Sequence, residues 1–324
     1  MSIEKEVAQE SVTSSLAAIL FSMNRAMQLD AVLRSFYRHC WDGDNFDLYI
    51  IYKTTSPTHS RQYQELTQEY RQFDRIHFLQ EVHFRIDLLS LLFDITALDR
   101  GSRFYKATTY LGGMFGRVTH RWIKPSSSKQ VLFLVDDNIL VSDFYLRDVR
   151  RALSLNPVAL GFSLRLGENT NYCYAHDQVQ QLPHFIQAAP GILKFNWTKA
   201  EHDFYYPLEL SSSIYRLSDV LPLINSRSFN NPNELESKMA GSSSLYKDSH
   251  PWLMCYTHSV TFCSPVNRVQ DGLSNRTGVV YEYPVDLLAE KFDAGYRIDV
   301  AAYDGFVSTG CHQEVELQYI QHES

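Results

Sequence analysis

The 324-residue chain contains no stretch that approaches the about 20 continuous apolar residues of a membrane-spanning helix. Its first residues, MSIEKEVAQESVTSS, carry mixed charges and no apolar core of the kind that secretory signal peptides have. We therefore expect a cytoplasmic protein, for which any membrane contact would have to be peripheral. The sequons at Asn196 and Asn275 carry little weight, because glycosylation requires the secretory route.

Cysteine is scarce, odd in number and scattered along the chain. The five cysteines are Cys40, Cys173, Cys255, Cys263 and Cys311. No two of them form a C-x-x-C pair or show zinc-finger spacing. The pattern predicts reduced, mostly buried thiols and excludes a disulfide framework.

The chain also has no excess of positive charge and no linker between its halves. With 30 Lys and Arg against 37 Asp and Glu, the formal net charge is −7, so the overall field gives no reason to expect nucleic-acid binding. The net charge does not exclude a locally basic pocket. The composition, 44% hydrophobic and 21% charged, is that of a globular protein with one large or two fused cores. Because no internal repeat or low-complexity tract interrupts it, we predict a single domain over residues 1–324.

Apolar runs that predict buried strands alternate with segments of helical spacing in the first half of the chain. Strands are expected over 16–24, 46–54, 75–82 and 130–135, and helices over 26–40, 59–73, 84–94, 106–123 and 142–156, the last with Ser142 or Asp143 as its cap. Beyond residue 167 no period is sustained. This order predicts an α/β fold with a mostly parallel central sheet flanked by helices, and an irregular C-terminal half along its open edge.

The segment VLFLVDDN places Asp136 and Asp137, followed by Asn138, directly after the fourth predicted strand. Carboxyl ends of parallel strands face the ligand crevice of an open sheet. Two adjacent carboxylates become tolerable there when a divalent cation neutralises them, and hard oxygen ligands suit Mg²⁺ or Mn²⁺. The alternative is an Asx turn with no ligand, which Asp and Asn also favour. The residues alone leave both interpretations open.

Several motifs together resemble a known enzyme family. FLVDDN, with ILFSMNRAMQLDAVLRSF near the N-terminus, resembles the aspartate motif and first nucleotide-binding unit of GT-A fold glycosyltransferases. The segments DFYYPLELSSSIYR, NPNELE, PVNRVQ and CHQEVELQYI resemble parts of bacterial sugar transferases of that fold.

The resemblance implies a GT-A type fold and a metal-dependent transferase of polysaccharide biosynthesis. Such an enzyme moves a sugar from a nucleotide diphosphate donor, a UDP-sugar being favoured, to a hydroxyl of a saccharide or glycan acceptor. It implies a nucleotide-sugar-binding half over 14–140 and an acceptor-binding, catalytic half over 141–324.

The resemblance also implies roles for individual residues. Six positions would contact the nucleotide of the donor: Asn24, Arg25, Tyr52, Lys53, Arg85 and Asp136, the last at the ribose. Each has a plainer explanation. Arg25 could instead be a solvated residue at the start of a helix. Lys53 could be a charged residue of an edge strand, and Arg85 and Asp87 could be a pair at the start of a helix.

The metal would be held by Asp137 with Asn138 and His312. The family usually has an acidic residue where this chain has Asn138. That departure leaves open whether Asp137 is the sole carboxylate ligand or whether Asp136 shares the ion.

Transfer with inversion at the anomeric carbon requires a base for the acceptor hydroxyl, and a carboxylate is the usual choice. NPNELESKM offers Glu234 and Glu236, of which we favour Glu236. Both could instead decorate a first helical turn, where the macrodipole favours acids, with Asn233 as the cap. A retaining mechanism would need no such base.

Weaker candidates for contacts with the acceptor lie between residues 203 and 215. Asp203 and Glu209 flank FYYP and could serve as acceptor or base residues. Rings stack on the apolar faces of sugars, so Tyr205, Tyr206 and Tyr215 are expected near an acceptor.

Two other functions compete with this hypothesis. A sugar-nucleotide pyrophosphorylase needs a Gly-rich basic loop after its first strand, and FSMNRAMQ contains no glycine. A catalytically inactive α/β domain that binds a sugar or a partner protein is the other, because fold does not imply function.

Overall fold

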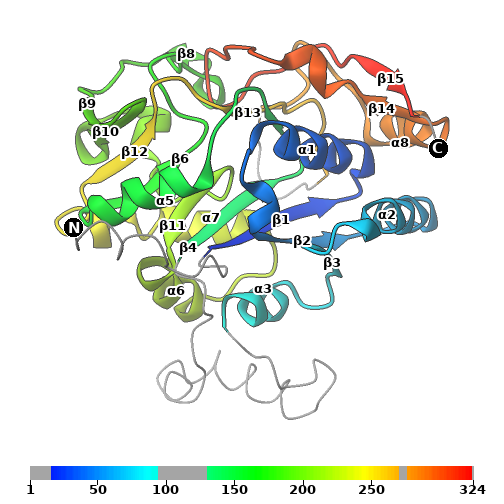
Figure 1. Cartoon of the computed structure of the whole chain (residues 1–324), viewed down its shortest axis with the longest axis horizontal. Helices are drawn as coiled ribbons and strands as arrows, with labels where there is room; N and C mark the ends of the chain where they lie inside the picture. The colour runs from blue at the N-terminus through cyan, green and yellow to red at the C-terminus, as the bar shows by residue number, and fades with distance from the viewer. Residues whose placement is uncertain (1–15, 94–129, 270–275, 323–324) are drawn as a thin grey trace, which may run out of the picture.

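The structure, a computed structural model, describes residues 16–93, 130–269 and 276–322. Its centre is a nine-stranded sheet in the order β3-β2-β1-β4-β11-β6-β12-β10-β9 (Figure 1). In that order the strands are β3 (Ile76–Gln80), β2 (Asp47–Lys53), β1 (Leu16–Met23), β4 (Gln130–Val135), β11 (Ser213–Arg216), β6 (Ala159–Ser163), β12 (Trp252–Tyr256), β10 (Ile192–Asn196) and β9 (Ile186–Ala189). The helix expected over 106–123 lies outside the described residues.

Seven strands of this sheet run in one direction. β3, β2, β1 and β4 are parallel neighbours, β11 is antiparallel to both β4 and β6, and β12 is parallel to β6. β10 is antiparallel to β12 and to β9, so β11 and β10 are the two reversed strands. The predicted α/β class with a mostly parallel central sheet is confirmed. Strands from both predicted halves of the chain join this one sheet.

Helices cover both faces of the sheet. The described α-helices are α1 (Ala26–His39), α2 (Pro57–Glu69), α3 (Phe84–Leu92), α5 (Leu146–Leu155), α6 (Leu217–Ser226), α7 (Pro232–Ala240) and α8 (Val285–Asp293). In β1, Leu16, Ala18 and Leu20 belong to the cluster under α1, α2, α5 and α8, whereas Ile19 and Phe21 belong to the one under α3, α6 and α7. Figure 1 shows α1 above the sheet and α3 and α6 below it. A strand buried on both faces is therefore apolar throughout.

Smaller elements complete the described fold. Three two-stranded sheets are formed by β5 (Asn138–Leu140) with β13 (Thr261–Cys263), β14 (Tyr296–Ile298) with β15 (Tyr319–Gln321), and β7 (Tyr172–Cys173) with β8 (Gln178–Val179). Short 3₁₀ turns are η1 (Gly43–Asn45), η2 (Tyr70–Gln72), η4 (Tyr174–His176), η5 (Trp197–Lys199), η6 (His202–Tyr205), η7 (Ser243–Tyr246) and η8 (Val300–Tyr303).

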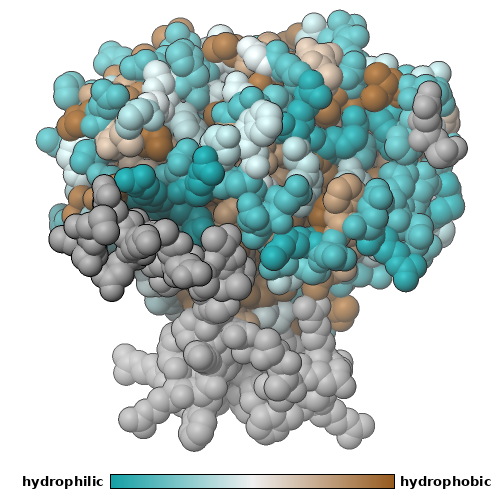
Figure 2. Space-filling model, in the orientation of Figure 1, coloured by the Kyte–Doolittle hydropathy of each residue, from teal (hydrophilic) through white to brown (hydrophobic). Residues whose placement is uncertain are grey.

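Within the described residues, no helix has both the length and the apolarity to cross a membrane. The face seen in Figure 2 is mostly hydrophilic, with scattered hydrophobic residues. All five cysteines are buried and unpaired, as their spacing predicted.

Helix α5 starts later than expected, because another part of the chain caps it. Phe144 forms an isolated parallel bridge with Cys40, which keeps the preceding residues extended. The carboxylate of buried Asp42 then accepts hydrogen bonds from the backbone N–H of Leu146 at 2.8 Å and of Arg147 at 2.9 Å. The prediction of a cap at Ser142 or Asp143 is therefore wrong, and the cap comes from a loop about one hundred residues earlier.

Replacing Asp42 with alanine should lower the free energy of unfolding by about 2 kcal/mol, because two N–H groups of α5 lose their acceptor in a buried setting. Replacing Asp143, whose side chain is 59% exposed, should cost less than about 0.5 kcal/mol. Urea unfolding of both variants measures the difference. Equal losses in the two variants would mean that Asp143 stabilises the start of α5 as much as Asp42 does.

Candidate active site

The carboxyl ends of neighbouring strands bring charged residues together at one edge of the sheet. β2, β1 and β4 are parallel neighbours, so Lys53 at the end of β2, Arg25 after β1 and Asp136 after β4 lie at the same edge. β11 runs the other way, so Glu209 precedes it at this edge, and Arg165 follows β6. Ligands of open α/β sheets bind at such an edge.

Both carboxylate oxygens of Asp136 accept hydrogen bonds from residues at the end of β1 and the start of α1. Its Oδ2 accepts hydrogen bonds from Ser22 Oγ at 2.9 Å and from the backbone N–H of Met23 at 3.0 Å. Its Oδ1 accepts one from Arg25 Nη1 at 2.8 Å. Ser22 Oγ also lies 2.5 Å from the hydroxyl of buried Tyr63. Asp136 therefore anchors the turn between β1 and α1.

Arg25 offsets the repulsion between the two aspartates. Besides its bond to Asp136, Nη1 lies 3.9 Å from Asp137 Oδ2, and Nη2 donates to the carbonyl of Asn267 at 2.6 Å. Burial opposes the charge of this guanidinium, but the neighbouring carboxylates raise its pKa overall. The alternative explanation of Arg25 as a solvated residue at a helix start is wrong, since its side chain is 10% exposed.

Asp137 is held much less firmly than its neighbour. Its Oδ1 is shielded from solvent and has no hydrogen-bond partner, as is also true of Arg25 Nε and Arg165 Nε. Burial raises the pKa of Asp137, although Arg25 opposes this effect. A buried carboxylate oxygen without a partner calls for a proton or a cation. Asp137 therefore fits a divalent ion by its chemistry.

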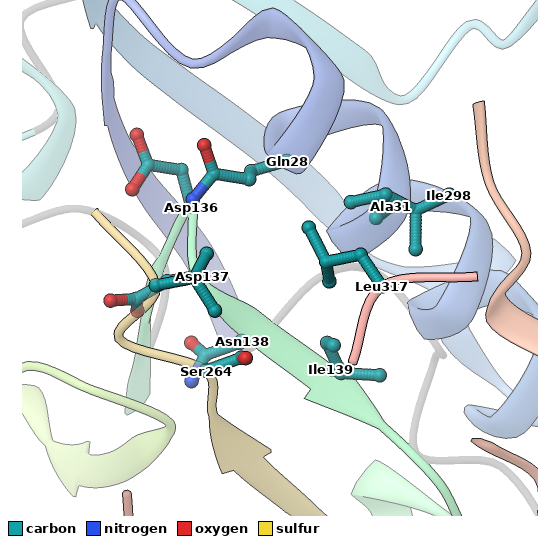
Figure 3. Close-up of a pocket in the computed structure, with 10 residues that line it drawn as sticks. Gln28, Ala31, Asp136, Asp137, Asn138, Ile139, Ser264, Ile298 and Leu317 are labelled. Carbon is teal, nitrogen blue, oxygen red and sulfur yellow. The ribbon is translucent and has the colours of Figure 1, made fainter. Parts of the chain in front are cut away.

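A pocket lies directly against the acidic pair (Figure 3). Asp136, Asp137 and Gln28 line its polar side, and Figure 3 shows Ile298 and Leu317 together on its apolar side. The polar side meets the edge of the sheet, and the apolar side lies between α1 and the C-terminal segment.

Asn138 is occupied by the turn itself. Its Oδ1 accepts a hydrogen bond from the backbone N–H of Val135 at 2.9 Å, and its Nδ2 lies 3.0 Å from Cys263 Sγ. These contacts close the turn between β4 and β5. The turn interpretation thus describes Asn138, whereas Asp137 remains without such contacts on Oδ1.

His312 lies beside the strand that pairs with the acidic motif. It forms an isolated bridge with Cys263 of β13, and Cys263 pairs with Asn138 of β5. Burial, and to a lesser extent the charge of Arg165, lower the pKa of His312 to about 3, so its imidazole is neutral at physiological pH. Neutral imidazole is the form that binds metals. Its Nε2 lies 3.2 Å from Arg165 Nη1.

Arg165 joins several parts of the site, and our sequence analysis did not single it out. Its guanidinium forms a buried ion pair with Glu209, and Nη1 lies 3.1 Å from Cys263 Sγ. Glu209 in turn accepts hydrogen bonds from Ser163 and Ser213.

The charged groups that shift the pKa of Arg165 show which acidic side chains lie near it. Burial tends to lower its pKa, but nearby thiols and the carboxylates of Glu236 and Asp203 raise it overall. A signal was present in the sequence, because Arg165 is the single charged residue in the apolar segment VALGFSLRL. Such a residue requires a buried partner.

Replacing Arg165 with methionine should lower the free energy of unfolding by about 3 kcal/mol, because Glu209 would keep a buried charge without a cation. The double variant Arg165→Met with Glu209→Gln should recover more than half of that loss. Urea unfolding of the two variants tests this. If the double variant is no more stable than the single one, the pairing is not what stabilises this region.

Glu234 belongs to the start of α7. Asn231 is the cap, and its Oδ1 accepts from the backbone N–H of Glu234 at 2.9 Å. Glu234 Oε2 accepts from the backbone N–H of Asn230, the residue before the cap, at 2.9 Å, so the two side chains close the helix start in the manner of a capping box. The prediction of Asn233 as the cap is wrong, because Pro232 takes the first helical position.

Glu236, one half-turn further on, points to the charged edge instead. Its Oε2 accepts a hydrogen bond from the backbone N–H of Leu210 at 3.0 Å, and its Oε1 lies 3.3 Å from the hydroxyl of Tyr206. Its charge is one of those that raise the pKa of Arg165. The structure thus separates the two glutamates, with one in a cap and one near the cluster.

The structure also separates the weaker candidates for contacts with the acceptor into exposed and buried residues. Tyr205 and Tyr206 are exposed, whereas Tyr215 is fully buried and its hydroxyl donates to the carbonyl of Glu209 at 2.7 Å. Tyr215 is therefore a core residue and unable to stack on a sugar. Burial raises the pKa of Asp203, a carboxylate near Arg165.

Residues at the ends of β1 and β2 already have partners within the protein. Asn24, with a φ of 56°, donates from Nδ2 to Thr55 Oγ1 at 2.7 Å and accepts from the backbone N–H of Thr55 at 2.9 Å. Lys53, 49% exposed, lies 3.2 Å from Glu81. Tyr52 stacks on Tyr63, with ring centroids 4.8 Å apart.

Arg85 and Asp87 serve helix ends. Arg85 donates to the carbonyls of Asn225 at 2.7 Å and Arg227 at 2.8 Å, at the C-terminal end of α6. Asp87 accepts from the backbone N–H of His83 at 2.9 Å, at the start of α3. The helix-start explanation therefore describes Asp87, and Arg85 stabilises a different helix.

Comparisons with known proteins extend these observations. No protein-family model matches the chain. Over 284 residues it is 24% identical to the curated bifunctional glycosyltransferase pgtA of Dictyostelium discoideum, an alignment that covers 79% of this chain and 32% of that protein. The chain thus spans about a third of its relative's length. The resemblance to glycosyltransferases is confirmed by this relative.

Two solved structures are also similar. TarS 1–349 of S. aureus in complex with UDP is 14% identical with a TM-score of 0.42, and the match covers 77% of this chain and 61% of that one. The mannosyltransferase PcManGT from Pyrobaculum calidifontis, in complex with GDP-Man and Mn²⁺, is 9% identical with a TM-score of 0.36, over 74% of this chain and 53% of that one.

Proposed function

We propose that the chain is a metal-dependent glycosyltransferase that moves a sugar from a nucleotide diphosphate, with a UDP-sugar as the favoured donor, to a hydroxyl of a saccharide or glycan. The observation that carries the proposal is the Oδ1 atom of Asp137, shielded from solvent without a partner at the carboxyl edge of the sheet. Similarity to a curated glycosyltransferase supports the same class of activity.

Asp137 is the residue proposed to hold the cation, with neutral His312 as the second ligand once the ion replaces the contact of its Nε2 with Arg165 Nη1. Asn138 is a poorer ligand than the sequence suggested, because its amide already serves the turn. A bound Mn²⁺ or Mg²⁺ would offset the negative charge of the departing diphosphate. Asp136 is proposed to act through Arg25, which it orients, while it remains the candidate for the ribose.

The donor nucleotide is proposed to lie across the ends of β1 and β2. Lys53 is half exposed there, and an ammonium is a suitable partner for phosphate. Asn24 fixes the adjacent backbone. The ring of Tyr52 lies next to them. For the nucleobase to stack on this ring, it must bind the face away from Tyr63 or displace Tyr63.

Glu236 is proposed as the base of an inverting transfer. The acceptor hydroxyl gives its proton to the carboxylate of Glu236 while its oxygen forms a bond to the anomeric carbon. The bond from that carbon to the diphosphate breaks at the same time, and the nucleoside diphosphate leaves with the electron pair. The hydrogen bonds from Leu210 and Tyr206 hold the carboxylate in place for this step.

A donor-cleavage assay tests the function. The chain is incubated with a panel of UDP- and GDP-sugars, with saccharide acceptors, and with either Mn²⁺ or a chelator, and release of nucleoside diphosphate is followed. We expect release with at least one donor, at least tenfold faster with Mn²⁺ than with the chelator. Release from no donor under any condition would instead favour a sugar-binding domain without catalysis.

A further inference from the structure

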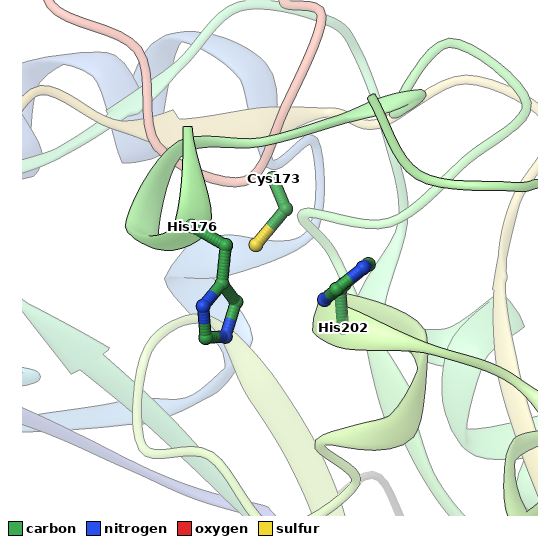
Figure 4. A group of neighbouring side chains, drawn as sticks. All are labelled: Cys173, His176 and His202. Atoms are coloured by element: carbon green, nitrogen blue, oxygen red, sulfur yellow. The ribbon is translucent and has the colours of Figure 1, made fainter. Parts of the chain in front are cut away.

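Two short segments bring one cysteine and two histidines together, apart from the acidic pair. Among the described residues, Cys173, His176 and His202 form a group whose ligand atoms all lie within 4.8 Å of one another. Figure 4 shows the three side chains converging on a common space. Cys173 is buried and His176 is exposed, so the space between them is open to solvent on one side.

The local fold explains how these residues meet. Cys173 is on β7, and the chain turns through η4, which ends at His176, before Gln178 of β8 pairs with Cys173. The hairpin thus presents a Cys-x-x-His pair from its strand and its loop. His202 comes from η6 and has a φ of 49°, in the left-handed region that is uncommon for a residue with a side chain.

The β7–β8 hairpin is short and partly exposed. Its strands have two residues each, and Val179 is 77% exposed. Isolated hairpins of this size are marginally stable in water. Its contacts with η6 include polar ones: Gln178 Nε2 lies 2.8 Å from His202 Nε2, a contact that an ion bound at this nitrogen would replace, and Gln180 Nε2 lies 3.3 Å from Asp203 Oδ2.

We propose that Cys173, His176 and His202 bind a zinc ion that cross-links the β7–β8 hairpin to η6. A thiolate and two imidazoles are the ligands that zinc prefers. Zn–S and Zn–N bonds of about 2.3 and 2.0 Å put tetrahedral ligand atoms about 3.5 Å apart, so the most widely separated pair must close by at most about 1.3 Å. Water takes the fourth position, on the exposed side.

Binding replaces the thiol proton of Cys173, which passes to solvent. Asp203 Oδ1, 3.5 Å from Cys173 Sγ, adds negative charge that favours a divalent ion at this position. The donor set differs from that of the acidic pair, where the oxygen ligand Asp137 suits Mn²⁺ or Mg²⁺. The two sites can therefore be tested independently, and the zinc site does not depend on the proposed transfer activity.

Metal analysis and cobalt substitution of the purified chain test the site. After dialysis against metal-free buffer, we expect about one zinc per chain. The Co²⁺-substituted protein should show a thiolate-to-metal charge-transfer band, which requires a cysteine ligand. His176→Ala should abolish the band and weaken zinc binding at least tenfold. His184→Ala, at another exposed histidine, should change neither.

His176 is exposed, so its replacement should leave the fold intact, whereas Cys173→Ser alters a buried position and serves as a second variant. Loss of the band in Cys173→Ser supports the assignment of the sulfur ligand. Zinc bound without a thiolate band in the cobalt form, or a band that persists in His176→Ala, would overturn the proposal. So would a wild-type chain that retains no zinc and whose melting temperature zinc leaves unchanged.

Discussion

Replacing Asp137 with asparagine is expected to lower the rate of sugar transfer at least about 10³-fold, or about 4 kcal/mol in the barrier. The amide has nearly the same shape, but it carries no charge for a cation that must offset the departing diphosphate. The loss should appear in kcat, because the cation acts on charge that develops in the transition state. Steady-state kinetics with the active donor measure it.

The same substitution should stabilise the protein in metal-free buffer. Burial raises the pKa of Asp137 above its ordinary value, so the charged form costs stability in the fold at neutral pH. The protein loses this stability as pH rises from the ordinary pKa of an aspartate through the raised pKa of Asp137. Asparagine carries no charge and therefore avoids the loss. We expect a melting temperature about 2 °C higher.

The control for Asp137 is Asp248→Asn, at an exposed aspartate, which should alter neither rate nor melting temperature. Full activity in Asp137→Asn would show that the carboxylate has a structural role. A drop in both activity and melting temperature would also count against a cation site, because it would mean that the charge is needed for folding.

Glu236→Gln is expected to lower kcat about 10³-fold while donor affinity stays unchanged. Glutamine retains an acceptor for Leu210 and a partner for Tyr206, so the local structure should persist. What it lacks is the ability to take the acceptor's proton. Single-turnover rates together with donor binding by calorimetry separate the two effects.

The matched control lies two residues earlier on the same helix. Glu234→Gln preserves the capping box, since glutamine can also fill that position, and should change kcat less than about twofold. If Glu234→Gln gives the large loss and Glu236→Gln does not, the base is the other glutamate. If neither does, transfer proceeds without a carboxylate base, as a retaining mechanism would allow.

The sequence predicted the first four strands of the sheet well, because their information is local. β1 is apolar on both faces and ends at a polar stretch, and β4 ends at Asp136 in the same way. The parallel order of such strands follows from the helices between them. That Asp136 and Asp137 lie at the carboxyl edge of the parallel strands could therefore be deduced without a structure.

Contacts between distant segments could not be predicted in the same way. Asp42 caps α5 across about one hundred residues, and Arg165 pairs with Glu209 only after β11 has entered the sheet beside β6. The sequence identifies Arg165 as a charge in an apolar run but not its partner. Likewise, no spacing rule connects Cys173 to His202, because a hairpin and a separate 3₁₀ turn bring them together.

The order of roles within the acidic motif also depends on tertiary contacts. From the sequence, a turn and a metal site were both open for this motif, and the family resemblance implied the ribose for Asp136 and the metal for Asp137 and Asn138. Arg25 binds Asp136 tightly, and Val135 occupies the amide of Asn138. Asp137 is the residue of the motif that has a buried side-chain oxygen, Oδ1, without a hydrogen-bond partner.

Calorimetric titration of UDP and GDP into the wild-type chain and Asp137→Asn, each with Mn²⁺ or with a chelator, examines the cation site itself. We predict that Mn²⁺ tightens binding of one nucleotide to the wild type at least tenfold, about 1.4 kcal/mol, and has no effect on the variant. Affinities that are the same with and without Mn²⁺ in both proteins would contradict the account, and Asp137 would then be a residue of the turn.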